Sequence, residues 1–319
     1  MRFGVLQFFS WPGRRVPLGT VYDRALDRIR IMDQGGYDAV WLAEHHFSTY
    51  SVCPSVHIMG MHAADITRNL RIGTGVSLAA FYHPLRLAEE VALLDNLSGG
   101  RVNWGAGRGF DATEMRVFGV ERDESYDRFR ENVDIVQKAW SCDRLTYEGR
   151  FNTYRDVEVL PKPLQNPMPT WIGVSSQDAI DWAAGQGHAI LMDPHSTHDE
   201  IGRKYARYRA ALPAECDGRR RPTPMARLIA IAPTDAAAEA VAREGARWTV
   251  ESYVGVRGDT SKEERIQRYV DEVIIHGSPA KVVDQLKRLE EEIPLGYLLA
   301  SILSHQTLLL LTDKVIPRM

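Results

Sequence analysis

The stretch DAVWLAEHHF, at residues 38–47, contains the pattern on which the fold depends. Its apolar first half predicts a buried strand, and a carboxylate and two imidazoles, Glu44, His45 and His46, stand where that strand is expected to stop. In parallel α/β barrels, the side chains that perform chemistry collect at the carboxyl ends of the strands. The stretch therefore predicts a barrel strand with a functional site at its end.

Short apolar runs alternate with segments of helical period along the whole chain, which is typical of βα units. The runs lie at 2–8, 38–44, 70–78, 101–107, 170–175, 188–193, 226–232 and 296–301. Eight such units predict a single (β/α)8 barrel of the triosephosphate isomerase type. The main rival is a doubly wound sheet, which needs a G-x-G-x-x-G turn in its first unit. The two closest stretches, GAGRGF and GTGVSL, do not complete that motif.

Two helices between these runs have clear ends. In SYDRFRENVDIVQKAW, apolar residues recur every three or four positions, and Ser125 is expected to cap the start. In HPLRLAEEVALLDNLSGG, Pro84 stands in the first turn and Gly99 at the exit. Proline-rich residues 141–169 and strongly charged residues 243–275 interrupt the pattern. We expect one barrel domain over residues 1–319 that carries both stretches as insertions.

Composition excludes several classes of protein. The 39 basic and 42 acidic residues are spread along the chain and give a net charge of -3, so no basic stripe for nucleic acid is expected. Three widely spaced cysteines argue against a disulfide framework and favour a reducing compartment. Neither a signal peptide nor an apolar run of the ~18 residues that a membrane span needs is recognisable. We expect a cytoplasmic protein without a membrane partner.

The two histidines do not predict a metal site. Neighbouring residues on a strand point to opposite faces, so His45 and His46 cannot both reach one ion unless the strand has already ended. Adding Cys53, His57 and His62 gives spacings that match no zinc pattern. The simplest alternative is that the histidines only bond to backbone at the strand end. The contiguous Glu-His-His favours a functional role.

A second group of residues has the composition of a phosphate site. The strand in GGRVNWGAGRGF runs into a glycine-rich turn that carries Arg108, and arginine is a forked, permanently charged donor for phosphate. In GVSSQDAIDWA, Ser175 and Ser176 follow the fifth apolar run and precede a helix that begins near Gln177. Helix amino termini bind anions through free N–H groups. An ordinary helix cap at Ser176 is the alternative.

Together these stretches resemble the bacterial luciferase-like family of flavin-dependent oxidoreductases. The resemblance is carried by AEHHF, by NLRIGTGV with HPLRLAEEVALLDNLSGGRVNWGAGRG and RVFG, by WIGVSS with WAAGQG, and by HGSPAKVVDQL. The order and spacing of these motifs along most of the chain are more specific than any one of them. The resemblance implies a single barrel with FMN at its carboxyl-end mouth.

The resemblance also implies roles for individual residues. His45 would be the active-site histidine that assists proton transfer beside the flavin, with Glu44 as its polar support. Arg108 would lie beside the flavin phosphate, with Ser175 and Ser176 as the other half of that site. Gly75 and Val76 match the position of a non-proline cis peptide beneath the flavin ring. Gly107 occupies a cofactor-binding position where light-emitting members carry a reactive cysteine, so light emission is not expected.

The implied activity is that of an FMN-dependent monooxygenase. Reduced FMN reacts with O₂ to give a flavin C4a-peroxide, which oxygenates a small organic substrate in a dry pocket. Because no nicotinamide fingerprint is present, a separate flavin reductase is expected to supply reduced FMN. A homodimer is also expected. Two alternatives stay open: a deazaflavin-dependent hydride-transfer oxidoreductase and a non-catalytic flavin-binding subunit.

Residues near the strand ends are expected to shield this chemistry. Apolar candidates for the pocket wall are Trp11, Phe47, Trp104 and Phe110, although Trp104 is equally compatible with the barrel core. The insertion at 243–275 is expected to act as a lid, because loops that follow barrel strands lie at the catalytic mouth. Its residues Trp248, Tyr253 and Val254 would close over the flavin, and Gly255 and Gly258 would leave it little apolar area to bury. A plain surface helical hairpin is the alternative.

Overall fold

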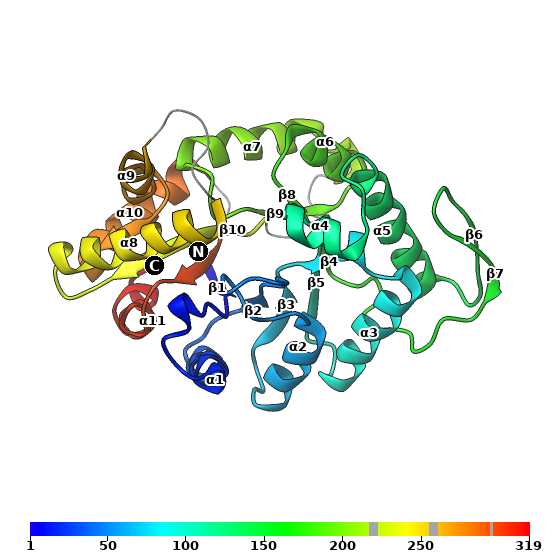
Figure 1. The fold of residues 1–319 in the computed structure, drawn as a ribbon, viewed down its shortest axis with the longest axis horizontal. Helices are drawn as coiled ribbons and strands as arrows, with labels where there is room; N and C mark the ends of the chain where they lie inside the picture. Colours follow the sequence, from blue (N-terminus) through cyan, green and yellow to red (C-terminus); the bar gives the residue numbers. More distant parts are fainter. Residues whose placement is uncertain (217–222, 255–260, 294–295) are drawn as a thin grey trace.

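A computed structural model of the chain describes residues 1–216, 223–254, 261–293 and 296–319. Within these residues, eight parallel strands form a closed barrel (Figure 1). They are β1 (Arg2–Gln7), β2 (Ala39–Leu42), β3 (Arg71–Thr74), β5 (Val102–Gly107), β8 (Thr170–Val174), β9 (Ala189–Met192), β10 (Met225–Ile231) and β12 (Tyr297–Ile302). Strands β12 and β1 pair directly, and the pair Met192–Met225 joins β9 to β10. Six of the eight predicted runs contain one of these strands, and the runs at 226–232 and 296–301 overlap β10 and β12, each with an offset of one residue, so the predicted barrel is confirmed.

Helices surround the barrel. They are α1 (Leu18–Gln34), α2 (Val56–Asp65), α3 (Pro84–Leu97), α4 (Ala112–Phe118), α5 (Ser125–Ser141), α6 (Gln177–Gly185), α7 (His198–Ala211), α8 (Asp235–Thr249), α9 (Lys262–Glu272), α10 (Pro279–Glu292) and α11 (His305–Leu310). Two π-helical turns, η4 (Val250–Val254) and η5 (Leu311–Val315), and four 3-10 turns, η1 (Pro12–Arg14), η2 (Ala79–Phe81), η3 (Ala214–Cys216) and η6 (Ile316–Arg318), complete the helical elements. In the described part of the chain, no helix is both long and apolar enough to cross a membrane.

The two helix ends predicted from sequence differ in outcome. Helix α3 begins at Pro84, and Gly99 follows its last turn with a φ of 71°, as predicted. Helix α5 begins at Ser125, but this serine does not cap it. Its hydroxyl donates to the carbonyl of Arg122 at 2.6 Å and accepts from Arg108 at 2.8 Å. The hydroxyl is therefore committed to holding Arg108 and not to the free N–H groups of the helix.

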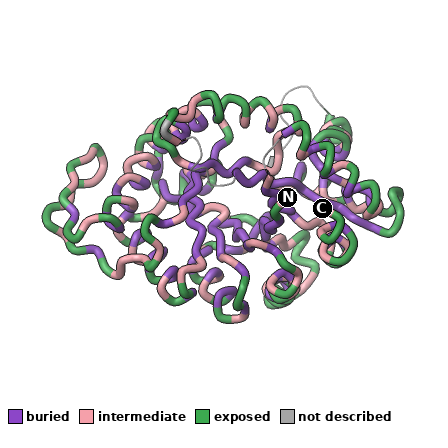
Figure 2. The backbone as a smooth tube through the Cα atoms, turned by 180° about the vertical axis from the view of Figure 1, so that it is seen from behind, coloured by how far each residue is buried: buried purple, intermediate pink, exposed green. Residues whose placement is uncertain are grey.

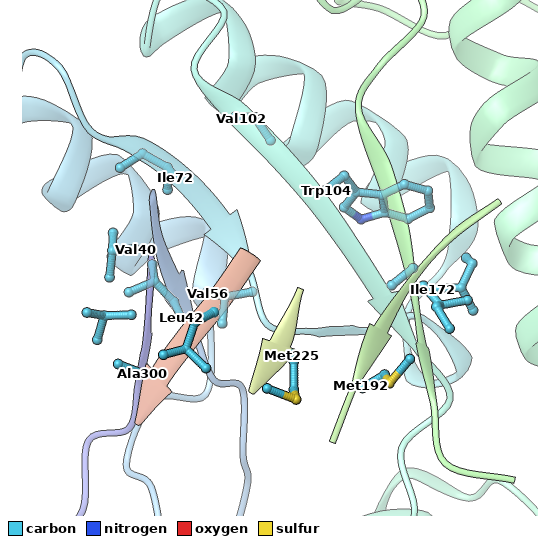
Figure 3. Packing of buried hydrophobic residues seen from close by; sticks show 14 of the residues in the cluster. Val40, Leu42, Val56, Ile72, Val102, Trp104, Ile172, Met192, Met225 and Ala300 are labelled. Atoms are coloured by element: carbon cyan, nitrogen blue, oxygen red, sulfur yellow. The ribbon is translucent and has the colours of Figure 1, made fainter. Parts of the chain in front are cut away.

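The core has two layers because strand residues alternate between the inside and the outside of the barrel. Inside lie Leu6, Trp41, Ala43, Trp171, Leu191, Ala226, Tyr297 and Leu299. The side chains drawn in Figure 3 form the outer layer between strands and helices. Trp41 and Trp171 meet edge to face inside the barrel at 5.2 Å. A Cβ at Gly73 would lie 2.3 Å from Trp41, so only glycine leaves room for the Trp41 ring inside the barrel. Figure 2 shows the buried strands enclosed by helices with exposed outer faces.

Four further strands in the described part of the chain extend this plan. Strand β4 (Ser77–Leu78) pairs with β5, and β11 (Ile275–Gly277) pairs with β10. Residues 141–169 carry an antiparallel hairpin of β6 (Leu145–Glu148) and β7 (Thr153–Val157), which lies at the edge of the molecule in Figure 1. Residues 243–275 comprise the end of α8, η4, α9 and the start of β11, while Gly255 and Gly258 lie outside the described residues.

Candidate active site

A cavity of about 190 Å³ lies at the carboxyl ends of the barrel strands. Seven of the eight residues predicted for the site line it: Glu44, His45, Gly75, Val76, Gly107, Arg108 and Ser175. The eighth, Ser176, is not among the lining residues and stands next to Ser175 at the start of α6. Segments from four strands, far apart in sequence, therefore meet in one place because parallel strands end at the same rim of a barrel.

His45 lies in the cavity wall beside a buried carboxylate. Its Nδ1 atom is 3.5 Å from Oε1 of Glu114, the third residue of α4, whose side chain is 3% exposed. The His45 ring stacks over Phe8 with 6.2 Å between ring centroids and contacts Tyr50 edge to face. A buried carboxylate next to one ring nitrogen fixes the orientation of an imidazole. This arrangement suits a residue that accepts or holds a proton at the cavity.

Glu44 supports a different histidine from the one expected. Its Oε1 atom lies 3.1 Å from Nε2 of His46 and accepts a hydrogen bond from the Tyr82 hydroxyl at 3.0 Å. The expectation that Glu44 supports His45 is therefore wrong in this structure, and Glu114 takes that place. The reason is that β2 ends at Leu42, so both histidines lie beyond the strand and its strict alternation. No pattern in the sequence distinguishes Glu114 from an ordinary glutamate in the first turn of a helix.

The floor of the cavity is formed at the ends of β3 and β5. The peptide bond between Gly75 and Val76 is cis, as the resemblance implied. The Thr74 hydroxyl accepts from the backbone N–H of Gly105 at 2.8 Å and donates to the carbonyl of the same residue at 2.7 Å. A Cβ at Gly107 would lie 2.3 Å from Cγ2 of Val76. The Val76 side chain thus occupies the space that a larger residue at position 107 would need.

One end of the cavity is rich in cations and hydrogen-bond donors. The guanidinium of Arg108 lies 4.1 Å from the centre of the Tyr126 ring, and the Tyr126 hydroxyl is 3.0 Å from Oγ of Ser176. Arg130 of α5, which sequence reasoning missed, lines the same end and lies 5.4 Å from the Trp182 ring. Among the described residues, no carboxylate pairs with Arg108 or Arg130.

Two further observations fit this end to a phosphate group. Burial lowers the pKa of Arg108, and the buried Nε of Arg130 has no hydrogen-bond acceptor in the described structure. Ser175 and the amino terminus of α6 add a hydroxyl and free N–H groups. A phosphate monoester would supply the negative charge and acceptor atoms that this end lacks. Ser176 caps α6, accepting from the N–H of Ala179 at 3.3 Å, so the predicted cap is confirmed, and its role toward a phosphate stays a prediction.

The end of β9 contributes two titratable groups that sequence reasoning missed. Asp193 and His195 both line the cavity, and the Asp193 carboxylate accepts from the backbone N–H of His195 at 2.9 Å. Burial raises the pKa of Asp193, but the ammonium of Lys204, 2.8 Å away, outweighs it, so the pKa is lowered to about 2. Burial lowers the pKa of His195 to about 4, so its imidazole is neutral at pH 7. The rule that identified Glu44 and His45 applies equally to these two residues.

Aromatic rings close the side of the cavity. Tyr253 of η4 stacks on Tyr50, with 4.0 Å between centroids, and meets the rings of His45, Phe110 and His195 at 5.1–5.3 Å. Burial raises the pKa of Tyr253 well above its ordinary value, so its hydroxyl stays protonated. The predicted lid residue therefore belongs to the cavity wall.

The four predicted wall residues lie in different places. Of these, Phe110 lines the cavity, whereas Trp104 is fully buried against Trp140 in the outer core layer. Trp11 and Phe47 are not among the lining residues, and Phe47 is 59% exposed. Val254, also predicted to close over the flavin, is the last residue of η4.

Comparison with known proteins gives this geometry a context. The oxygenase component of a flavin-dependent trigonelline monooxygenase from Acinetobacter baylyi is 29% identical over 203 residues, 63% of this chain and 56% of that protein. The oxygenating constituent of 3,6-diketocamphane monooxygenase from Pseudomonas putida, solved with FMN, is 20% identical with a TM-score of 0.83, covering 100% of this chain and 99% of that one. The coenzyme F420-dependent tetrahydromethanopterin reductase of Methanopyrus kandleri is 17% identical with a TM-score of 0.76, covering 99% and 98%.

Coverage differs between these comparisons. The chain spans about half the length of the curated relatives it matches first, whereas the two solved structures match over nearly their full length and share the fold. The model of the luciferase-like monooxygenase family matches residues 1–294. This match covers most of the chain and agrees with its barrel and its strand-end cavity. The chain therefore belongs to the luciferase-like monooxygenase family.

Proposed function

We propose that this protein is an FMN-dependent monooxygenase that uses reduced flavin and O₂ to oxygenate a small organic substrate. The observation that carries the proposal is one cavity with a donor-rich end at Arg108 and Arg130 and with His45 in its wall. The apolar side chains of Leu6, Val76 and Leu78 line the same cavity. The combination suits a ring system with a phosphate tail.

Each group in the cavity has a physical task in this proposal. Arg108, Arg130, Ser175 and Ser176 would hold the phosphate, and the surface at Gly75, Val76 and Gly107 would support the ring. When bound, reduced flavin supplies the two electrons that convert O₂ into one inserted oxygen atom and one water molecule. His45 would accept or return a proton, with Glu114 orienting it. The rings of Phe8, Phe110 and Tyr253 would exclude water.

A deazaflavin-dependent hydride-transfer enzyme is the second candidate, and a neighbouring cavity favours it. This cavity of about 430 Å³ adjoins the phosphate end and is lined by Ser175, Ser176, Gln177, Ile180, Ser196, Glu200, Arg203, Lys204 and Arg207. It offers room for the longer anionic tail of a deazaflavin cofactor. However, Lys204 already pairs with Asp193, and Arg207 pairs with Asp181. FMN, which ends at its phosphate, needs no charge from this region and is the cofactor we favour.

A separate flavin reductase is part of the proposal. The Acinetobacter baylyi relative is named as the oxygenase component of its monooxygenase, which supports a division between oxygenase and reductase here. A homodimer is also proposed, because neighbouring helices α2 and α3 expose apolar side chains. Ile58 is 76% exposed, Leu97 60% and Leu93 48%. A second copy of the chain would cover these side chains.

Turnover with a defined cofactor tests the proposed function. Protein is mixed with reduced FMN or with reduced deazaflavin, ¹⁸O₂ and a panel of aldehydes, ketones and aromatic compounds, and products are examined by mass spectrometry. We expect one ¹⁸O atom in a product with reduced FMN only, and a ~10²–10⁴-fold slower reaction for His45→Ala with unchanged FMN binding. Oxidation of reduced deazaflavin by a substrate without ¹⁸O gain would favour the second candidate. Oxygen uptake unaffected by the protein would favour a non-catalytic flavin-binding subunit.

His46→Ala is the matched control for that experiment. The His46 side chain pairs with Glu44, and His46 is not among the residues that line the cavity. We therefore expect its loss to slow oxygenation much less than the loss of His45. A large effect of His46→Ala together with an active His45→Ala variant would show that the proton-transfer role was assigned to the wrong histidine.

A further inference from the structure

A third cavity, also of about 430 Å³ but distinct from the one lined by Lys204 and Arg207, lies at the barrel mouth on the other side of the proposed flavin site's wall at Leu6 and Phe8. Its walls come from α1, from α8 and from the carboxyl ends of β1 and β12, and β1 lies between α8 and α1 in Figure 1. Leu6 and Phe8 line both cavities, and Leu6 belongs to the cluster inside the barrel. Phe8 also stacks on His45. This third cavity, the side compartment, therefore shares a wall with the proposed flavin site.

This compartment gathers positive charge without partners. Arg15, Arg24 and Arg28 line it, and the opposing carboxylate in its wall is the exposed Glu244. Within the described residues, none of the three arginines forms an ion pair or a side-chain hydrogen bond. Arg24 and Arg28 stand one turn apart on α1, and burial, followed by the charge of Arg24, lowers the pKa of Arg28. Arg15 and Arg24 are exposed and Arg28 is half-buried. Like charges at this spacing on α1 are mildly destabilising, so an anion between Arg24 and Arg28 would be favourable.

The unsatisfied atoms in the compartment are donors. Nε of Arg28 and Nε1 of Trp248 are buried and have no acceptor in the described structure. A buried donor without an acceptor is unfavourable, so such donors usually mark a missing partner. That partner must supply acceptor atoms and negative charge. The rest of the wall combines apolar side chains, such as Val21 and Leu228, with polar ones, such as Ser301, so the partner can also carry an apolar body.

We propose that the compartment binds the anionic group of the substrate. The substrate is a small organic acid whose carboxylate or other oxyanion is held by Arg24, Arg28 and Trp248. Its apolar part extends past Phe8 towards His45, where oxygen would be inserted. The binding site stands on the geometry of the compartment alone, whereas the identity of its occupant as the oxygenated substrate rests on the proposed function.

A pair of fluorescent probes that differ in charge tests the site without turnover. The anionic probe is 8-anilinonaphthalene-1-sulfonate, and the neutral probe, N-phenyl-1-naphthylamine, lacks the sulfonate. We expect Arg24→Met and Arg28→Met each to weaken binding of the anionic probe at least about tenfold, because each removes a charged donor. Binding of the neutral probe and of FMN should stay unchanged.

Arg30→Met is the matched control on the same helix. Arg30 is exposed and pairs with Asp27, and it is not among the residues that line the compartment. Its replacement removes the same net charge from α1, so it should leave the affinity for the anionic probe unchanged. An equal loss of affinity in Arg30→Met, or no loss in Arg24→Met and Arg28→Met, would overturn the anion site.

A second arm tests whether the bound anion is the substrate. A mixture of organic acids and their primary amides is incubated with the protein, reduced FMN and ¹⁸O₂. We expect ¹⁸O in the acids, and at least about tenfold less in the Arg28→Met variant. Amides oxygenated as well as acids by the unaltered protein would overturn the substrate class. Absence of ¹⁸O from both classes, with the anionic probe still dependent on Arg24 and Arg28, would contradict the proposed oxygenation and support the anion site.

Discussion

At the scale of single residues, the contact between Gly107 and Val76 shapes the floor of the cavity. A Cβ at position 107 would lie 2.3 Å from the valine side chain, which is too close for any real contact. We predict that Gly107→Ala destabilises the free protein by about 1–3 kcal/mol, the usual scale for overpacking. Because Val76→Ala removes the clashing atoms, the double variant should be at least ~1 kcal/mol more stable than the sum of the single effects.

Chemical denaturation of the four proteins measures this coupling. If the two single effects simply add, the side chain of Val76 does not fill the space next to Gly107. The same contact bears on light emission. A cysteine at position 107 would displace Val76, and the chain carries glycine there, so the absence of light emission stays a prediction that this contact supports.

The burial of His195 leads to a prediction about how the free energy of unfolding depends on pH. Burial lowers its pKa from 6.5 to about 4, so the unfolded chain takes up a proton at higher pH than the folded chain does. The stabilising effect of a neutral His195 is therefore complete above pH 6.5 and is lost as the pH falls towards 4. At pH 4 the loss amounts to about 3 kcal/mol. Replacing His195 by Gln should remove this part of the acid sensitivity.

The measurement is the free energy of unfolding of both proteins at pH 7 and at pH 4.5. His305→Gln is the control, because His305 is exposed at the start of α11. Equal pH dependence in the unaltered protein and in His195→Gln would show that His195 is not held neutral by burial.

At the scale of elements, η4 contributes to the cavity wall, whereas the first turn of α9 is exposed. Tyr253 of η4 is part of the cavity wall, and Ser261 and Glu264 form a capping box at the start of α9. We predict that FMN binding slows tryptic cleavage after Lys262 and Arg265. At an FMN concentration of 100 times the Kd, the slowing should reach about 100-fold if opening of this turn requires loss of FMN.

Cleavage after Arg150 is the internal control, because this residue lies between β6 and β7, away from the cavity. Its rate should not change with FMN. Equal rates at Lys262 and Arg265 with and without FMN would favour a surface helical hairpin with no link to the ligand. Arg257, a further tryptic site in the predicted lid, lies outside the described residues.

Elements also show what sequence could and could not predict. Apolar runs such as DAVWLAE predicted strands correctly, and Pro84 predicted the start of α3. These patterns can be read from sequence because they depend only on neighbouring residues. The predicted capping role of Ser125 was wrong, since its hydroxyl donates to the carbonyl of Arg122 and accepts from Arg108. Arg108 comes from a turn that precedes α5, so local pattern contains no information about that contact.

At the scale of the whole molecule, barrel closure decides which polar residues share a site. The strand-end rule identified Glu44, His45 and Arg108, because parallel strands end at one rim. It did not identify Glu114, which contacts His45 from helix α4, or Arg130, which lines the cavity from helix α5. Their positions depend on how the helices pack on the barrel. The same packing leaves the compartment between α1 and α8 that we assign to the anionic group of the substrate.

The central claim is that this mouth binds FMN with its phosphate at Arg108 and Arg130. The most direct test is to measure the affinities of FMN and riboflavin, which lacks the phosphate, for the unaltered protein and for Arg108→Ala. Loss of a hydrogen bond to a charged group costs about 1.5–3 kcal/mol, so FMN should bind about 10–150 times more weakly to the variant. Riboflavin should bind both proteins equally. If Arg108→Ala weakens riboflavin as much as FMN, or weakens neither, the phosphate does not lie at this end and the proposed cofactor site is wrong.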